Sequence, residues 1–135
     1  MRINKFKFDN DTSVNGVWFN GPDGLRLKVA RANNVQYRDF MDVKMRPMVR
    51  SSRMAQLDET AARKDLERLD VEAHARFVIK DWGCCQDENG EEILFSVEKA
   101  IELFNEMPDF LQLVRTYSLD LDAFRSGAKA ESQGN

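Results

Sequence analysis

The strongest constraint on the fold is a turn cluster near the N-terminus, Asn20-Gly21-Pro22-Asp23-Gly24. Gly and Asn tolerate positive φ angles and Pro presets its own φ, so this composition predicts a tight turn. A β-prone run at residues 14–19 precedes the turn, and Leu25, Leu27 and Val29 alternate with basic residues after it. This alternation is the pattern of a half-buried strand. The sequence therefore predicts a β-hairpin with these three aliphatic residues on its buried face.

Helical patterns follow the hairpin. Asn33 or Asn34 can cap a helix that runs through about residue 46. Pro47 then predicts a kink or a division into two helices, because proline removes a helical hydrogen bond. A further helix is expected from a cap at Asp58 to about Trp82, where Gly83 stops it.

Shorter helices are predicted in the last third of the chain. Residues 84–95 read as a loop with a turn at Asn89-Gly90, and Ser96 can cap the helix that follows. Pro108 fits the first turn of the next helix, and residues 121–124 continue as a short final one. The predicted fold is therefore mainly α, of the α+β class: an N-terminal β-hairpin followed by a bundle of four or five helices. The aromatic residues expected in the core are Trp82, Phe95, Phe104 and Phe110.

The length of 135 residues is that of one domain. We expect an N-terminal arm at residues 1–12, a single domain at residues 13–126, and a disordered C-terminal tail at residues 127–135, which has nothing to bury. The mean hydropathy is -0.55, and no apolar run approaches the roughly 18 residues of a membrane span. We expect neither a secretory signal nor contact with a membrane.

Charge is divided unevenly along the chain, although the net charge is only -3. Residues 1–57 carry a net charge of +6, and residues 58–135 carry -9. Three interpretations remain open: the two halves face each other within one fold, copies associate head to tail, or the basic half contacts nucleic acid.

Residues that carry catalysis or bind metals are sparse. His74 is the single histidine, and the adjacent Cys84 and Cys85 have neither the spacing of metal ligands nor that of a redox pair. A calcium loop centred on Gly90 would need an acidic first residue and a terminal Glu, but Cys85 and Ser96 occupy those positions. We therefore expect no catalytic site, no cofactor and no metal, and we predict that the protein is not an enzyme.

The segment Tyr37–Met54 is the best candidate for a binding surface. Its methionines lie at helical spacing, which fits either core filling or an adaptable apolar surface that re-packs against a partner. Its basic residues would suit an acidic partner or a neighbouring subunit, and no signature of a DNA- or RNA-binding motif accompanies them. The residues predicted to bind a partner are Tyr37, Met41, Lys44, Met45, Arg46, Met48, Arg50 and Arg53.

An ordered series of motifs occupies the second half of the chain. Val78-Ile79-Lys80-Asp81-Trp82-Gly83 leads into a polar loop that ends in Asn89-Gly90-Glu91-Glu92-Ile93. Phe95-Ser96-Val97 and then Met107-Pro108-Asp109-Phe110 follow, and Asn15-Gly16-Val17-Trp18 lies upstream. In this series, over roughly residues 8–126, the chain resembles the tail assembly chaperones of long-tailed bacteriophages and prophages.

This resemblance implies a binding function. Such chaperones bind the long, largely helical tape measure protein in the host bacterial cytoplasm, keep it soluble and promote assembly of the tail tube around it. They are absent from the mature virion. In many phages a frameshifted longer form also recruits the major tail tube protein, and such an extension would attach at residues 127–135. For this chain the resemblance implies tape measure protein as the partner, with self-association also expected.

Two alternatives belong to other functional classes. The first is a nucleic-acid-binding or regulatory phage protein that uses the basic residues of the segment 38–53. The second is a minor structural component of the tail, such as a completion or connector protein, which would remain in the virion.

Overall fold

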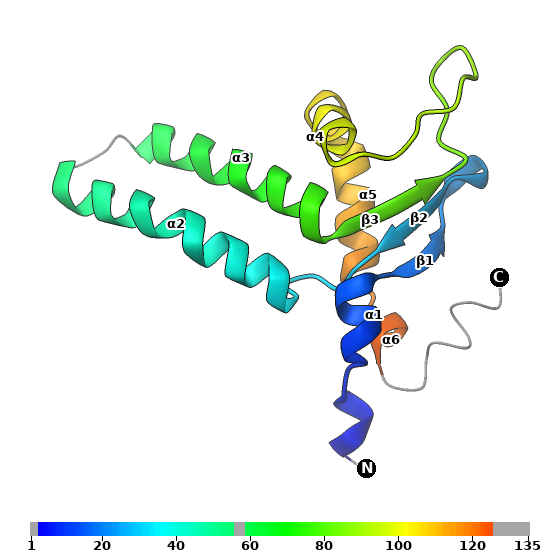
Figure 1. The fold of residues 1–135 in the computed structure, drawn as a ribbon, viewed down its shortest axis with the longest axis horizontal. Coiled ribbons are helices and arrows are strands. Elements are labelled where there is room, and N and C mark those ends of the chain that lie inside the picture. Colours follow the sequence, from blue (N-terminus) through cyan, green and yellow to red (C-terminus); the bar gives the residue numbers. More distant parts are fainter. Residues whose placement is uncertain (1–2, 56–58, 126–135) are drawn as a thin grey trace.

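The computed structural model describes residues 3–55 and 59–125, and Figure 1 shows their arrangement. The predicted tail at residues 127–135 and the predicted cap at Asp58 lie outside this range. The elements, in chain order, are η1 (Ile3–Phe6, a 3-10 helix), α1 (Asn10–Asn15), β1 (Val17–Asn20), η2 (Pro22–Gly24, a 3-10 turn), β2 (Arg26–Val29), α2 (Val35–Ala55), α3 (Glu59–Phe77), β3 (Ile79–Gly83), α4 (Val97–Glu106), α5 (Pro108–Ser118) and α6 (Leu121–Phe124).

The predicted hairpin and the mainly α, α+β fold class are confirmed. Strands β1 and β2 pair antiparallel, with Val17 opposite Val29 and Asn20 opposite Arg26. Leu27 and Val29 are fully buried, as the alternation predicted.

The expected start of the first strand was wrong at Val14, which lies in helix α1. The Asp9 carboxylate caps this helix by accepting hydrogen bonds from the backbone N–H groups of Asp11 (2.9 Å) and Thr12 (3.2 Å). Gly16 then ends α1 with a φ of 96°, a backbone conformation that favours glycine.

The prediction that one helix extends to about Trp82 was also wrong, because helix α3 ends at Phe77 and strand β3 follows. Strand β3 pairs antiparallel with β2, with Leu27 opposite Trp82 and Val29 opposite Ile79. A short apolar run fits a buried strand as well as a buried helix end, so periodicity alone could not decide between them. The third strand completes a sheet of order β1-β2-β3.

Helices α2 and α3 are inserted between β2 and β3. The backbone N–H of Ala30 donates to the Val78 carbonyl at 2.7 Å, so the chain leaves and re-enters the sheet at one place. Between these points the two helices run side by side away from the sheet (Figure 1). Helix α2 continues through Pro47 instead of dividing there. Pro47 and Val43 are both exposed, so the carbonyl that loses its helical partner can bind water.

The main core lies between the sheet and helices α4 and α5. It contains buried residues from β2, β3, α3, α4 and α5. Trp82 and Phe104 are buried in it, while Phe95 and Phe110 are half-buried against it, so all four expected aromatics belong to the core or its margin. The indole N–H of Trp82 donates to the Ile93 carbonyl at 2.7 Å, which fixes the loop before α4. The predicted helix starts are also present. The Ser96 hydroxyl caps α4 by accepting a hydrogen bond from the Lys99 backbone N–H, and Pro108 is the first residue of α5.

Replacing Leu27 with alanine should destabilise the fold by about 3 kcal/mol, because it opens a cavity in the centre of the sheet. The same change at Leu119, which is 63% exposed, is the matched control and should shift stability by less than about 0.5 kcal/mol. Urea unfolding followed by circular dichroism would measure both. Equal losses in the two variants would contradict this account of the core.

Candidate functional site

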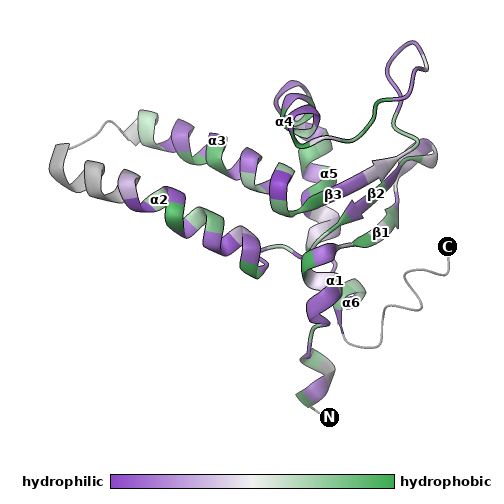
Figure 2. Cartoon of the chain, viewed as in Figure 1, coloured by the Kyte–Doolittle hydropathy of each residue, from purple (hydrophilic) through white to green (hydrophobic). Residues whose placement is uncertain are grey.

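We call the two long helices, α2 and α3, the arm. At about 1.5 Å per residue, the 21 residues of α2 span roughly 30 Å. Figure 2 shows apolar and polar residues interspersed along both helices. Figure 1 shows the arm extending away from the sheet, while the other helices stay close to it.

Apolar side chains of the arm are incompletely covered. Among the described side chains of α2, from residue 35 to residue 47, none is buried, and Val43 is 58% exposed. Among the described side chains of α3, buried ones occur only at residues 73–75, close to the sheet. We call this end of the arm, next to the sheet, its root. Farther from the sheet, Leu66 is exposed and Leu69 is half-buried. The described apolar residues of the arm are therefore only partly covered within one copy of the chain.

The root of the arm is fixed by Asn34, which is almost fully buried. Its side-chain oxygen accepts from the Tyr37 backbone N–H at 3.1 Å, so Asn34 is the predicted N-cap of α2. Its amide nitrogen donates to the carbonyls of Arg31 and Phe77, each at 2.9 Å. The start of α2 and the end of α3 are thus joined by one side chain.

Asp70 on α3 connects three helices at the same root. Its carboxylate accepts a hydrogen bond from the Tyr37 hydroxyl of α2 at 2.6 Å and another from the Arg115 guanidinium of α5. His74 Nδ1 lies 2.8 Å from the Asp70 carbonyl and must donate, because a carbonyl only accepts. The same nitrogen lies 3.3 Å from Asp70 Oδ1. These contacts hold the arm to α5.

Two ionisable groups of this cluster have shifted pKa values. Partial burial acts to raise the pKa of Asp70, but hydrogen bonds from His74, Tyr37 and Arg115 outweigh it and hold the pKa well below its usual range. Partial burial, together with the hydrogen bond to Asp70, raises the pKa of the Tyr37 hydroxyl above its usual value. The Asp70 carboxylate is therefore charged at neutral pH and stabilises the folded state.

The residues predicted to bind a partner all lie on helix α2. Tyr37 is used within the root, through its hydroxyl and through edge contact with the His74 ring at 5.4 Å between centroids. Met41 and Met45 are half-buried, whereas Lys44 and Arg46 are exposed. The backbone at Met48, Arg50 and Arg53 continues the helix.

The sequence pattern did not predict this polar cluster. Asp70 and Arg115 are 45 positions apart, and nothing in a chain rich in charged residues distinguishes them from solvated side chains. The one available signal was the 3.6-residue spacing that places Asp70 and His74 on one face of the same helix. Only the packing of α5 against α3 brings Arg115 to them.

Other chemistry is limited in the part of the chain that the structure describes. No group of three or more metal-ligating side chains occurs among these residues. Cys84 is exposed, and Cys85 is half-buried, which raises the pKa of its thiol. Among the described helices, none is both long and apolar enough to cross a membrane.

Comparison with known proteins gives one match. Residues 32–135 match the model of a family described as YdaY prophage protein. The matched region begins before the arm and includes α2, α3, β3 and all helices after it. No curated protein and no solved structure matches the chain.

Replacing Asp70 with asparagine should cost about 2–3 kcal/mol at pH 7, because the charged Arg115 loses its anionic partner. The pKa of Asp70 is lower in the folded state than its ordinary value of 3.8. Wild-type protein therefore has this stabilisation above about pH 4 and loses it as the pH falls further. Urea unfolding at pH 7 and at pH 3 should show the difference between wild type and variant shrinking at the lower pH.

The control for this prediction is Tyr37→Phe, which removes one neutral donor and keeps the carboxylate with Arg115. It should cost about 1 kcal/mol and keep most of the wild-type pH dependence. An Asp70→Asn variant whose deficit is the same at both pH values would contradict the assigned role of the charge.

Proposed function

The chain belongs to the family of YdaY prophage proteins, and from its resemblance to tail assembly chaperones we propose that it is a prophage tail assembly chaperone. In this proposal it binds the tape measure protein in the host bacterial cytoplasm, keeps it soluble and promotes assembly of the tail tube around it. The observation that supports the proposal most directly is the arm, whose apolar residues remain partly exposed.

The proposed binding mode is the packing of a helical segment of tape measure protein along the arm. An amphipathic helix is bound through apolar residues that recur every three or four positions. Met41 and Met45, four positions apart on one face of α2, offer partly exposed apolar contacts for such a helix together with Leu66 on α3. Flexible methionine side chains adapt to different sequences, which suits a chaperone that binds several segments of one long partner.

Charge around these apolar residues would help to select the segments. Lys44 and Arg46 are exposed on α2, and the Lys44 ammonium lies 5.8 Å from the centre of the Phe40 ring. Cations beside an apolar strip favour helices whose flanks carry Asp or Glu. Each contact is weak, so several copies acting along one tape measure protein would gain by avidity.

The proposal extends to the tail tube. A longer, frameshifted form would recruit the major tail tube protein, and the chaperone would leave before the virion is complete. Purified virions should then contain no copies of this chain, whereas a structural tail component would remain in them.

Co-expression with the tape measure protein of the same prophage tests the proposal. Tape measure protein should be insoluble alone, and soluble and co-purified with wild-type chain. The double variant Arg46→Glu/Arg50→Glu and the single variant Met45→Glu should each reduce co-purification several-fold, because they place negative charge on the arm. Tape measure protein that behaves the same with and without this chain would refute the chaperone function.

The matched control is Met107→Glu, which places the same charge on an exposed apolar residue between α4 and α5, away from the arm. It should leave co-purification unchanged. If this control and the arm variants lose binding equally while all remain folded, the arm is not the binding surface.

A further inference from the structure

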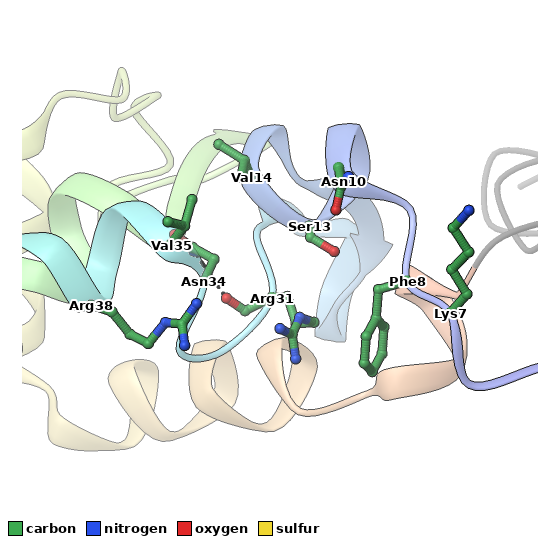
Figure 3. Close-up of a pocket in the computed structure, with 9 residues that line it drawn as sticks. All are labelled: Lys7, Phe8, Asn10, Ser13, Val14, Arg31, Asn34, Val35 and Arg38. Atoms are coloured by element: carbon green, nitrogen blue, oxygen red, sulfur yellow. Dashed lines mark hydrogen bonds between the residues drawn. The ribbon is translucent and has the colours of Figure 1, made fainter. Parts of the chain in front are cut away.

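A second surface feature lies between α1, residues 7–8 that precede it, and the start of α2. It is a pocket of about 370 Å³, shown in Figure 3, and it is open to solvent. Lys7, Arg31 and Arg38 line it, and no acidic residue does among those described. None of the ion pairs between described residues involves these three cations. The N-terminus of α2 adds partial positive charge at the same place.

Polar atoms of the pocket wall lack partners. Ser13 is only 7% exposed, and its hydroxyl has no hydrogen-bond partner among the described residues. The same holds for Nε of Arg31, whose guanidinium lies 4.2 Å from the centre of the Phe8 ring. Figure 3 shows Ser13, Arg31 and Phe8 around one space, with the Arg38 guanidinium on the far side of Arg31. Buried polar groups are almost always satisfied, so these point to a missing acceptor such as an oxyanion.

A complementary acidic group occurs in the loop between β3 and α4. Its tip is ordered by Asp87, whose carboxylate accepts from the backbone N–H groups of Asn89 and Glu91, each at 2.9 Å. Glu88, Glu91 and Glu92 are all exposed there, and no ion pair between described residues involves them. Figure 2 shows this tip as a hydrophilic projection from the rest of the domain.

The sheet separates the acidic tip from the pocket within one molecule. Ser13 and Arg31 flank the start of β1 and the end of β2, whereas the loop leaves from Gly83, opposite Arg26 at the start of β2. The two groups therefore lie beyond opposite ends of the same strands and cannot meet in one copy. Such a pair of surfaces is suited to head-to-tail contact between copies.

We propose that this pocket binds the acidic tip, residues 87–92, of a second copy of the chain. Three glutamates then face three cations, and one carboxylate approaches the half-buried Arg31 guanidinium beside the buried Ser13 hydroxyl. Leu94, which is 75% exposed beside the tip, meets Val35, which is 49% exposed at the pocket edge. This contact goes beyond the proposed chaperone function and does not depend on it.

Sedimentation velocity at low and high ionic strength tests the contact. Wild-type chain should self-associate at about 10 mM ionic strength and dissociate toward monomer at about 1 M, where the Debye length falls to about 3 Å. Arg38→Glu in the pocket and Glu91→Lys/Glu92→Lys in the tip should each weaken association about tenfold, since each replaces attraction with repulsion. All three residues are exposed, so both variants should keep the wild-type circular dichroism spectrum.

Mixing the two charge-reversed variants gives the decisive result. In the mixture, the basic tip of one variant can bind the pocket of the other variant, which carries Glu at position 38. The unchanged acidic tip of the second variant can bind the unchanged pocket of the first, so the mixture should recover association. Lys64→Glu, an equal charge change at an exposed position on α3, should associate like wild type. Failure of the mixture to recover overturns the proposal, as does a wild-type chain that is monomeric at every ionic strength.

Adding inorganic phosphate distinguishes the two possible oxyanions, a free phosphate and a carboxylate of a second copy. If phosphate raises the melting temperature of wild type but not of Arg38→Glu, and wild type remains monomeric, the pocket binds a free phosphate and the second-copy proposal is wrong. If phosphate instead competes with association and the mixed variants recover it, the carboxylate of the second copy is the ligand.

Discussion

The pairing of β2 with β3 is the interaction on which the rest of the structure depends. Val29 and Ile79 are 50 positions apart in sequence but lie opposite each other in the sheet. Everything between them must therefore leave and return at one point, and two long helices of similar length can do so only as an antiparallel pair. The arm is thus a consequence of strand pairing. Helices α4 and α5 pack against the sheet and complete the core of the rest of the domain, which we call the body.

This arrangement separates the core that stabilises the fold from the surface that we propose binds a partner. Burial is concentrated in the body, where Leu27, Val114 and Phe104 are almost fully covered. The arm contributes little of this burial and is held at its root by specific polar contacts of Asn34 and Asp70. Substitutions along the outer part of the arm can therefore alter what it binds without removing the core that keeps the domain folded.

The chain belongs to a prophage protein family, and the distribution of its surface chemistry supports the proposal that it acts through binding. The arm offers adaptable apolar contacts, and the body offers a cationic pocket at one end of the sheet and an acidic tip at the other. The charge imbalance between the two halves of the sequence is thus distributed over separate surfaces. In the proposed scheme, one surface binds the tape measure protein and the other two join copies along it.

Local chemistry in the sequence was sufficient for the β1–β2 hairpin, the Asn34 and Ser96 caps and the helix that Pro108 opens, because turns and caps depend on neighbouring residues. The candidate segment on α2 was predicted from its methionines and basic residues, and its role in binding stays a prediction. Tertiary structure alone decided that residues 79–83 form a strand, since the free edge of β2 selects that conformation. It also brought Asp70 to Arg115, and Ser13 to Arg31, because contacts between distant residues depend on how the elements pack.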